Sequence, residues 1–281
     1  MTETAHHPPV VLARGLRFPE GPALSPSGDT LYVVNLETEW LSRLELTTGA
    51  LTREWAALPD GGRGNGLTLG PDGDLFVADA GRRLIARVSL SGGHISTVAD
   101  RTEAGGLLRG PNDLVCDRHG GIYFTDPAGT WDDPIGAVYY VAPAPRTVSR
   151  VADGLQFPNG LVLSPDEKTL YVAESPLRRV TAVSLPAGAK RVFATVSTTG
   201  GPDGMRLGPD GDLYAAIYGE GVIARISPSG EVVARLPVGA GLRPTNLCFA
   251  PDGGSLYVTE ADSGTVVRMR TPPGGKPPSQ V

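Results

Sequence analysis

The stretch that begins at Pro158, PNGLVLSPDEKTLYVA, decides the fold, because close variants of it occur five more times in the chain. A polar residue opens an apolar run, a Pro-Asp turn follows, and Leu-Tyr-Val starts a second apolar run. Two apolar runs joined by a tight turn are typical of a β-hairpin. The other copies are PEGPALSPSGDTLYVV from Pro19, GNGLTLGPDGDLFVA from Gly64, PNDLVCDRHGGIYFT from Pro111, PDGMRLGPDGDLYAA from Pro202 and PTNLCFAPDGGSLYVT from Pro244.

The six copies are evenly spaced. Their aromatic residues, Tyr32, Phe76, Tyr123, Tyr171, Tyr214 and Tyr257, follow one another in steps of 44, 47, 48, 43 and 43 residues. Two further alternating stretches follow each hairpin, for example 179–185 and 191–196, and complete four strands. A strand repeat with a period in the forties predicts propeller blades. A β-sandwich also has short strands, but nothing in it requires the same turn and polar residue six times. We therefore expect an all-β, six-bladed β-propeller of four-stranded blades.

The ends of the chain predict how the ring closes. Residues 10–13 precede the first copy without a partner strand, and the last apolar stretch, 265–269, runs into the proline-rich segment 272–278. Proline cannot supply the hydrogen bonds of a strand interior. We expect 10–13 to form the outer strand of the last blade, within one domain of residues 10–270. Residues 1–9 and 271–281 are expected to be flexible tails.

Charge and cysteine content exclude several classes of partner. The chain has 281 residues, with Lys+Arg 25 against Asp+Glu 30, and no run of five basic residues. We therefore expect neither nucleic acid nor a membrane surface as a partner. No window of 18 apolar residues and no export signal is present. The two cysteines, Cys116 and Cys248, lack metal-site or disulfide-framework spacing and are expected to be free thiols in the cytoplasm.

A polar residue opens the first strand of every copy. The six are Glu20, Asn65, Asn112, Asn159, Asp203 and Asn246. First strands line the central channel of a propeller, so these side chains should converge at one mouth of it. Each Asn or Asp alone could be a turn residue, but turn chemistry does not select Glu at position 20. Two converging carboxylates would repel each other unless a cation lies between them.

The donor types restrict the cation. Carboxylate and amide oxygens without thiolate or imidazole suit Ca²⁺ first, Mg²⁺ or Mn²⁺ next, and Zn²⁺ less well. His94 and His119 are expected in turns on the opposite face, and the remaining two histidines lie in the N-terminal tail. No GxSxG motif is present, so a Ser-His-Asp device is not indicated.

At these residues the sequence resembles the family of senescence marker protein, gluconolactonase and luciferin-regenerating enzyme, whose members are six-bladed propellers and include sugar lactonases. The matching motifs are PEGP from Pro19, PNDL from Pro111, YFTDP from Tyr123, PNGL from Pro158 and PDG from Pro202. The resemblance spans all six blades. It implies that Glu20, Asn159 and Asp203 bind one divalent cation, that Asn112 is a fourth ligand or contacts substrate, and that Asp203 also serves as general base.

The sequence departs from the family pattern at one position. Sugar lactonases of the family often carry a basic residue two places before the Asn of PND, where this chain has Gly110. Arg109 is displaced by one place, so that it either reaches the pocket or is an ordinary surface residue. The departure weakens the implication of an aldonolactone substrate and leaves the metal site untouched.

We expect a divalent-metal-dependent hydrolase that opens a small cyclic ester, in which the cation polarises the carbonyl and Asp203 activates water. Further candidate substrate contacts are Asn65, Asn246, Trp131 on the long 127–136 loop, Arg109, Glu174 and Tyr218, each of which could instead be structural. Two other functions stay open: the same site acting in phosphotriester hydrolysis or in a cyclisation, and a non-catalytic binding scaffold with a structural ion. The lactone, the metal and the oligomeric state are not determined by the sequence.

Overall fold

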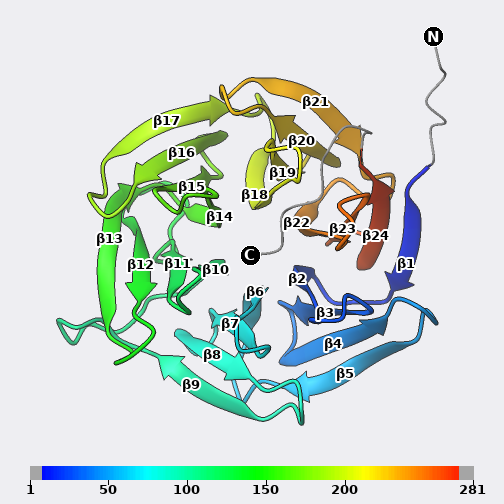
Figure 1. Cartoon of the computed structure of the whole chain (residues 1–281), viewed down its shortest axis with the longest axis horizontal. Coiled ribbons are helices and arrows are strands. Elements are labelled where there is room, and N and C mark those ends of the chain that lie inside the picture. The colour runs from blue at the N-terminus through cyan, green and yellow to red at the C-terminus, as the bar shows by residue number, and fades with distance from the viewer. Residues whose placement is uncertain (1–7, 272–281) are drawn as a thin grey trace.

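The computed structural model describes residues 8–271, and the regular secondary structure in this range is entirely β-strand. Six four-stranded antiparallel sheets are arranged around a central axis (Figure 1). The predicted six-bladed propeller of four-stranded blades is therefore confirmed. Within the described range, no helix is long and apolar enough to cross a membrane.

The strands follow the chain blade by blade, each blade running outward from the axis. Blade 1 holds β2 (Pro19–Leu24), β3 (Thr30–Asn35), β4 (Trp40–Glu45) and β5 (Leu51–Ala57), and blade 2 holds β6 (Gly64–Leu69), β7 (Leu75–Asp79), β8 (Leu84–Val88) and β9 (Ile95–Ala99). Blade 3 holds β10 (Leu114–Cys116), β11 (Ile122–Asp126), β12 (Gly136–Val141) and β13 (Val148–Leu155), and blade 4 holds β14 (Pro158–Leu163), β15 (Thr169–Glu174), β16 (Arg179–Ser184) and β17 (Lys190–Thr195). Blade 5 holds β18 (Gly201–Leu207), β19 (Leu213–Tyr218), β20 (Val222–Ile226) and β21 (Val232–Pro237), and blade 6 holds β22 (Pro244–Phe249), β23 (Ser255–Glu260), β24 (Thr265–Arg270) and β1 (Val10–Arg14).

The first strand of the chain closes the ring, as the sequence predicts. β1 pairs antiparallel with β24, with Val10 opposite Arg268 and Arg14 opposite Thr265. The outer edge of the last blade is thereby covered, which leaves fewer unpaired backbone groups there. Of the expected tails, residues 1–7 and 272–281 lie outside the described residues.

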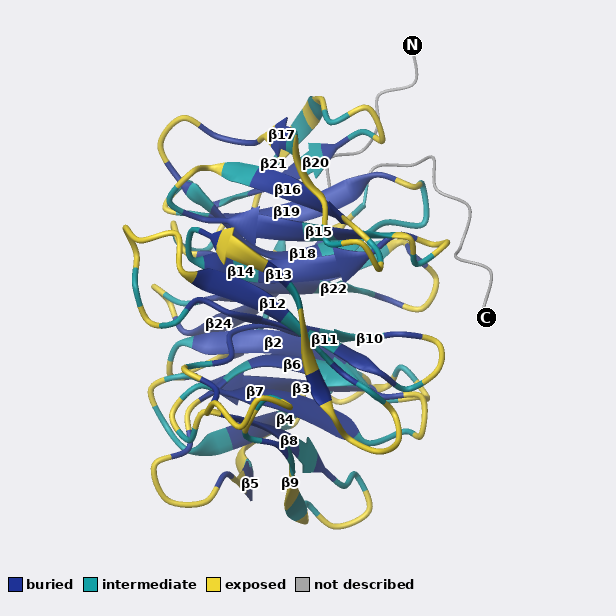
Figure 2. Ribbon diagram, turned by 90° about the vertical axis from the view of Figure 1, so that its left-hand side faces the viewer, coloured by how far each residue is buried: buried dark blue, intermediate teal, exposed yellow. Residues whose placement is uncertain are grey.

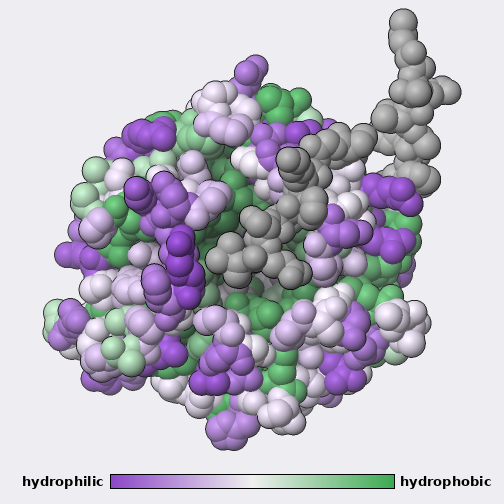
Figure 3. All heavy atoms as spheres, viewed as in Figure 1, coloured by the Kyte–Doolittle hydropathy of each residue, from purple (hydrophilic) through white to green (hydrophobic). Residues whose placement is uncertain are grey.

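The apolar core lies between neighbouring blades. One cluster, for example, joins Val162 and Val180 of blade 4 to Met205 and Ile217 of blade 5. Every residue of β3 and β7 is buried, and exposure concentrates in the loops and the outer strands (Figure 2). On the face seen in Figure 3, hydrophilic and apolar side chains are interspersed. Packing of blade against blade therefore fixes each first strand relative to the next.

A buried acceptor at the end of the second strand anchors the segment that leads into the first strand. It accepts a backbone N–H in five blades. The pairs, acceptor first, are Asn35 with Arg17 (3.0 Å), Asp79 with Arg63 (2.9 Å), Asp126 with Arg109 (2.7 Å), Glu174 with Gln156 (2.8 Å) and Glu260 with Arg243 (3.0 Å). In blade 5, Tyr218 ends the second strand, and Glu220 accepts the N–H of Gly200 instead, at 2.9 Å. These bonds fix the chain two or three residues before each polar residue of the channel mouth.

The glycine that follows the polar residue in four copies serves close packing at the axis. A Cβ on Gly160 would lie 2.2 Å from the carbonyl oxygen of Asp203, and one on Gly204 would lie 2.1 Å from Cγ of Asn246. Both distances are far below van der Waals contact, so only glycine lets the first strands of neighbouring blades approach this closely. The motif written as polar residue then glycine thus reflects blade packing.

Gly204→Ala should lower the free energy of unfolding by about 1–3 kcal/mol, because the added methyl group overpacks the blade 5 and blade 6 contact. The control is Gly92→Ala, since a Cβ at this exposed glycine meets nothing within 4 Å. Denaturant unfolding of the two variants and the parent protein measures the difference. Equal stability of both variants would contradict the packing argument.

Candidate active site

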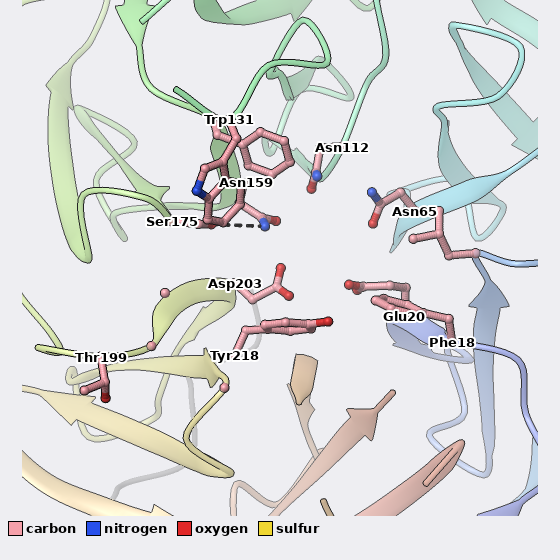
Figure 4. Close-up of a pocket in the computed structure, with 15 residues that line it drawn as sticks. Phe18, Glu20, Asn65, Asn112, Trp131, Asn159, Ser175, Thr199, Asp203 and Tyr218 are labelled. Atoms are coloured by element: carbon pink, nitrogen blue, oxygen red, sulfur yellow. Dashed lines mark hydrogen bonds between the residues drawn. The ribbon is translucent and has the colours of Figure 1, made fainter. Parts of the chain in front are cut away.

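A cavity of about 500 Å³ opens where the first strands begin. Five of the six predicted channel residues line it, namely Glu20, Asn65, Asn112, Asn159 and Asp203. They come from five different blades, and their side chains point toward a common centre (Figure 4). The volume falls in the range of about 300–1,000 Å³ that is typical of small-molecule sites.

Glu20 and Asp203 form the charged floor of this cavity. Their exposed fractions are 4% and 7%, and in Figure 4 the two carboxylates face each other across the channel. Burial, together with repulsion from Asp203 and Asp113, raises the pKa of Glu20 well above its usual range. Burial and repulsion from Asp113 do the same to the pKa of Asp203. Two buried carboxylates held this close disfavour their shared ionised state.

Asp113 is a third carboxylate that the sequence analysis missed. It is only 1% exposed, and it follows the cavity residue Asn112 directly. Burial raises its pKa, against the opposing attraction of Arg206. The sequence signal that could have identified Asp113 is the Asp of the PND motif. Four of the other five copies carry glycine directly after the polar residue, where this copy carries Asp113.

Asn246, the sixth predicted residue, does not line the cavity. It is 2% exposed, and its Nδ2 donates to Oδ2 of Asp113 at 3.4 Å. A hydrogen bond from Asn246 also lowers the pKa of Glu20. Asn246 therefore lies beneath the floor and braces two of its carboxylates.

Asn159 is held by neighbours on both sides. Its Nδ2 donates to Oγ of Ser175 at 3.3 Å, and its backbone carbonyl accepts a bond from Thr125 at 2.8 Å. Ser175 in turn donates to the carbonyl oxygen of Pro202, which precedes Asp203, at 2.7 Å. A hydrogen bond from Asn159 also opposes the rise in the pKa of Asp203. These bonds join blades 3, 4 and 5 at the cavity.

Aromatic side chains form much of the wall. Trp131 is 51% exposed and packs on Phe157, with ring centroids 4.8 Å apart, while Phe18 stacks on Tyr218 at 6.5 Å. Trp131 and Tyr218 are therefore placed at the cavity, as candidates in the sequence analysis. The other residues that line the cavity, which the sequence analysis did not identify, are Phe18, Leu36, Phe157, Ser175, Thr199, Gly200, Gly201 and Gly219.

Phe18 and Phe157 have an unusual backbone conformation. Their φ angles are 53° and 41°, although each precedes a proline and carries a bulky side chain. Such conformations cost about 1–3 kcal/mol each and gather at functional sites. The dipeptide Phe-Pro precedes both Glu20 and Asn159, and this repetition is the sequence signal that could have identified Phe18 and Phe157.

Arg109 and Glu174 do not line the cavity. Arg109 is exposed, and its backbone N–H donates to Asp126. Besides accepting the N–H of Gln156, the buried carboxylate of Glu174 accepts bonds from Nη2 of Arg179 at 2.7 Å and Oγ1 of Thr181 at 2.6 Å. Neither residue belongs to the site that the geometry defines.

The donor set suits a hard cation. The side chains at the centre offer carboxylate and amide oxygens, and no lysine, arginine, histidine or cysteine of the described residues lines the cavity. The described part of the chain contains no cluster of three or more His, Cys, Asp or Glu residues arranged to hold a metal. The protein donors available at the centre are the two facing carboxylates and the amide oxygens. The pKa values of Glu20 and Asp203 are raised, and a divalent cation between the two carboxylates would favour their ionised forms and lower both values.

Known proteins are similar to this chain in sequence and in architecture. A gluconolactonase of Zymomonas mobilis is 31% identical over 229 residues, which cover 74% of this chain and 63% of that protein. The lactonase drp35 of Staphylococcus aureus is 34% identical over 164 residues, which cover 54% of this chain and 50% of that protein. The solved structure of a gluconolactonase from Xanthomonas campestris superposes with a TM-score of 0.81 at 27% identity, covering 94% of this chain and 89% of that one.

The two curated relatives are matched over only 63% and 50% of their own lengths. The family model, in contrast, matches residues 18–262, which include all six first strands and the whole cavity. The chain therefore belongs to the SMP-30/Gluconolactonase/LRE-like region family.

Proposed function

We propose that the protein is a divalent-metal-dependent lactonase. The observation that carries the proposal is the pair of buried, facing carboxylates, Glu20 and Asp203, at the floor of a ligand-sized cavity. The printed names of the relatives, gluconolactonase and lactonase, support the same reaction. The substrate class is a small cyclic ester.

Glu20, Asn159 and Asp203, with Asn112 as a fourth donor, would hold the cation. Ca²⁺ fits this all-oxygen set best, and Mg²⁺, Mn²⁺ and Zn²⁺ follow. When bound, the cation supplies electrophilic polarisation of the ester carbonyl.

Asp203 is the general base of the proposed reaction. Its carboxylate takes a proton from a water whose oxygen adds to the carbonyl carbon, and it returns the proton to the ring oxygen as the carbon–oxygen bond breaks. The products are one hydroxy acid for each lactone and water consumed. Burial and repulsion from Asp113 raise the pKa of Asp203, and hydrogen bonds from Asn159 and from the N–H of Gly204 oppose this rise and so support its basic form. The amides of Asn65 and Asn112 face the same space and orient the ester.

The two cysteines take no part in the proposed chemistry. Cys116 and Cys248 are unpaired, and burial raises the pKa of each thiol to about 12, which suppresses the nucleophilic thiolate. Unpaired thiols fit the reducing cytoplasm, where we place the protein.

Asp203→Asn should lower the rate of lactone opening by about 10²–10⁴-fold, because it removes the base while keeping the side chain's shape. Acid release from γ-butyrolactone at saturating Ca²⁺ measures the rate, and calorimetry measures Ca²⁺ binding in parallel. Asp132→Asn, an exposed change on the 127–136 loop, is the control. Tight Ca²⁺ binding without turnover of any ester would instead favour a binding scaffold with a structural ion.

The metal-free protein should lose stability as pH rises above the ordinary carboxyl range of about 4 to 5. The folded-state pKa values of Glu20, Asp113 and Asp203 are raised, so the native state retains protons that the unfolded chain has released, and ionisation destabilises it. Ca²⁺ binds the ionised native form, so its stabilising effect should grow over the same range. Glu220 does not contribute in this range. Hydrogen bonds to it outweigh burial and lower its pKa to about 2.

Thermal unfolding in chelator and in Ca²⁺, across this pH range, measures the effect. Glu20→Gln should flatten the metal-free curve and weaken the response to Ca²⁺. A metal-free melting temperature that rises with pH over this range would contradict the electrostatic argument.

A further inference from the structure

The cavity is divided into a polar floor and a largely apolar wall, and this division specifies the substrate. We propose, on the basis of the proposed lactonase function, that the substrate is a neutral lactone with an apolar, preferably aromatic, substituent, and not a polyhydroxylated sugar lactone. The floor of carboxylates and amides receives the ester group. The aromatic wall receives the substituent.

The wall is built from four aromatic side chains of separate segments. Trp131 and Phe157 pack together on one part of it, and Phe18 and Tyr218 on another. In Figure 4, Trp131 and Tyr218 lie on opposite sides of the central carboxylates. Aromatic faces on both sides of a slot favour a planar apolar group, through burial and through ring stacking.

Four polar groups of the wall are already engaged within the protein. Ser175 donates its hydroxyl hydrogen to Pro202, and Thr199 donates its own to Oε1 of Glu220 at 2.5 Å. The N–H groups of Gly200 and Gly219 are bonded to Glu220 and to the carbonyl oxygen of Leu242. The guanidinium of Arg243 lies over the ring of Tyr218, 5.7 Å from its centroid. A polyol entering this wall would leave hydroxyl groups buried without partners, which is unfavourable.

The charge balance argues for a neutral ligand. Three carboxylates, Glu20, Asp113 and Asp203, lie at or just below the floor. One divalent cation would offset two of them, and Arg206 attracts the third, Asp113. No lysine or arginine among the described residues lines the cavity, and the exposed Arg109 bonds to Asp126 through its backbone. An anionic substrate, including a phosphate ester, would therefore find no positively charged side chain on the wall to pair with.

The test compares lactones that share one five-membered reacting ring. We expect kcat/KM for γ-phenyl-γ-butyrolactone to exceed that for γ-butyrolactone by at least about tenfold, and a γ-alkyl series to gain up to about fourfold per methylene. D-Glucono-1,4-lactone, which carries a polyol at the same position, should be a poorer substrate than γ-butyrolactone. A preference for the polyol lactone, or equal rates on all three, would overturn the inference while leaving the lactonase proposal intact. Turnover of none of the three would count against the lactonase proposal itself.

A variant of the wall tests which residues carry the preference. Trp131→Ala should reduce the phenyl-to-parent ratio of kcat/KM by about tenfold, mainly through KM. Ile135→Ala, an exposed apolar residue of the same loop that does not line the cavity, is the matched control and should leave the ratio unchanged. If Trp131→Ala leaves the ratio unchanged as well, the assignment of the wall is wrong.

Binding without turnover provides an independent measurement. In chelator, γ-phenyl-γ-butyrolactone should quench tryptophan fluorescence of the parent protein, and Trp131→Ala should abolish the quenching although Trp40 and Trp55 remain. D-Glucono-1,4-lactone should produce no quenching at the same concentration. Equal quenching by the two lactones would overturn the inference.

Discussion

Mutual repulsion among three buried carboxylates is the constraint on which the rest of the structure depends. Repulsion from Asp203 and Asp113 adds to burial in raising the pKa of Glu20, and repulsion from Asp113 does the same for Asp203, so the ionised groups would separate if their strands were free to move. The closed ring prevents this. Thr245 of blade 6 bonds to the carbonyl oxygen of Pro19 at 2.7 Å, and Ser175 of blade 4 bonds to that of Pro202, so each facing carboxylate follows a residue tied to the preceding blade. The pairing of β1 with β24 completes the circle. The fold thus holds together charges that only a cation or protons can neutralise.

The sequence predicts what is repeated and fails where one copy differs from the others. The period of the hairpins gave the number of blades, and the position of Glu20 and Asp203 at the start of first strands placed them at one mouth. Asp113 was missed because it occupies a place that is glycine in most copies, so the pattern concealed a buried charge. Asn246 obeys the pattern but does not line the cavity, and its side chain bonds to Asp113 instead. The repeat therefore predicts the position of a residue on its strand, while contacts with other blades determine where its side chain points.

Glu174 and Tyr218 illustrate the same limit. Both end a second strand on the face of the cavity, so position alone gives them equal standing as substrate contacts. In the structure, the Glu174 carboxylate accepts a backbone N–H and two side-chain hydrogen bonds. The residue at this position accepts a backbone N–H in four other blades as well. Tyr218 does not make the corresponding bond, because Glu220 accepts the N–H of Gly200 instead. Glu174 bonds to a backbone N–H, whereas Tyr218 does not and lines the cavity. The two can be told apart only once the acceptor of each buried backbone N–H is known.

The site therefore divides its two tasks between two kinds of element. The charged and amide groups of the floor stand on first strands, which glycine contacts and hydrogen bonds between blades fix at the axis. The aromatic wall comes mostly from connecting segments, where Trp131 lies on a long loop and Phe18 and Phe157 hold strained backbone before a first strand. Loops tolerate change better than packed strands do. It follows that the floor can persist while the wall is rebuilt for another ligand, and that membership in the SMP-30/Gluconolactonase/LRE-like region family constrains the floor more closely than it constrains the ligand.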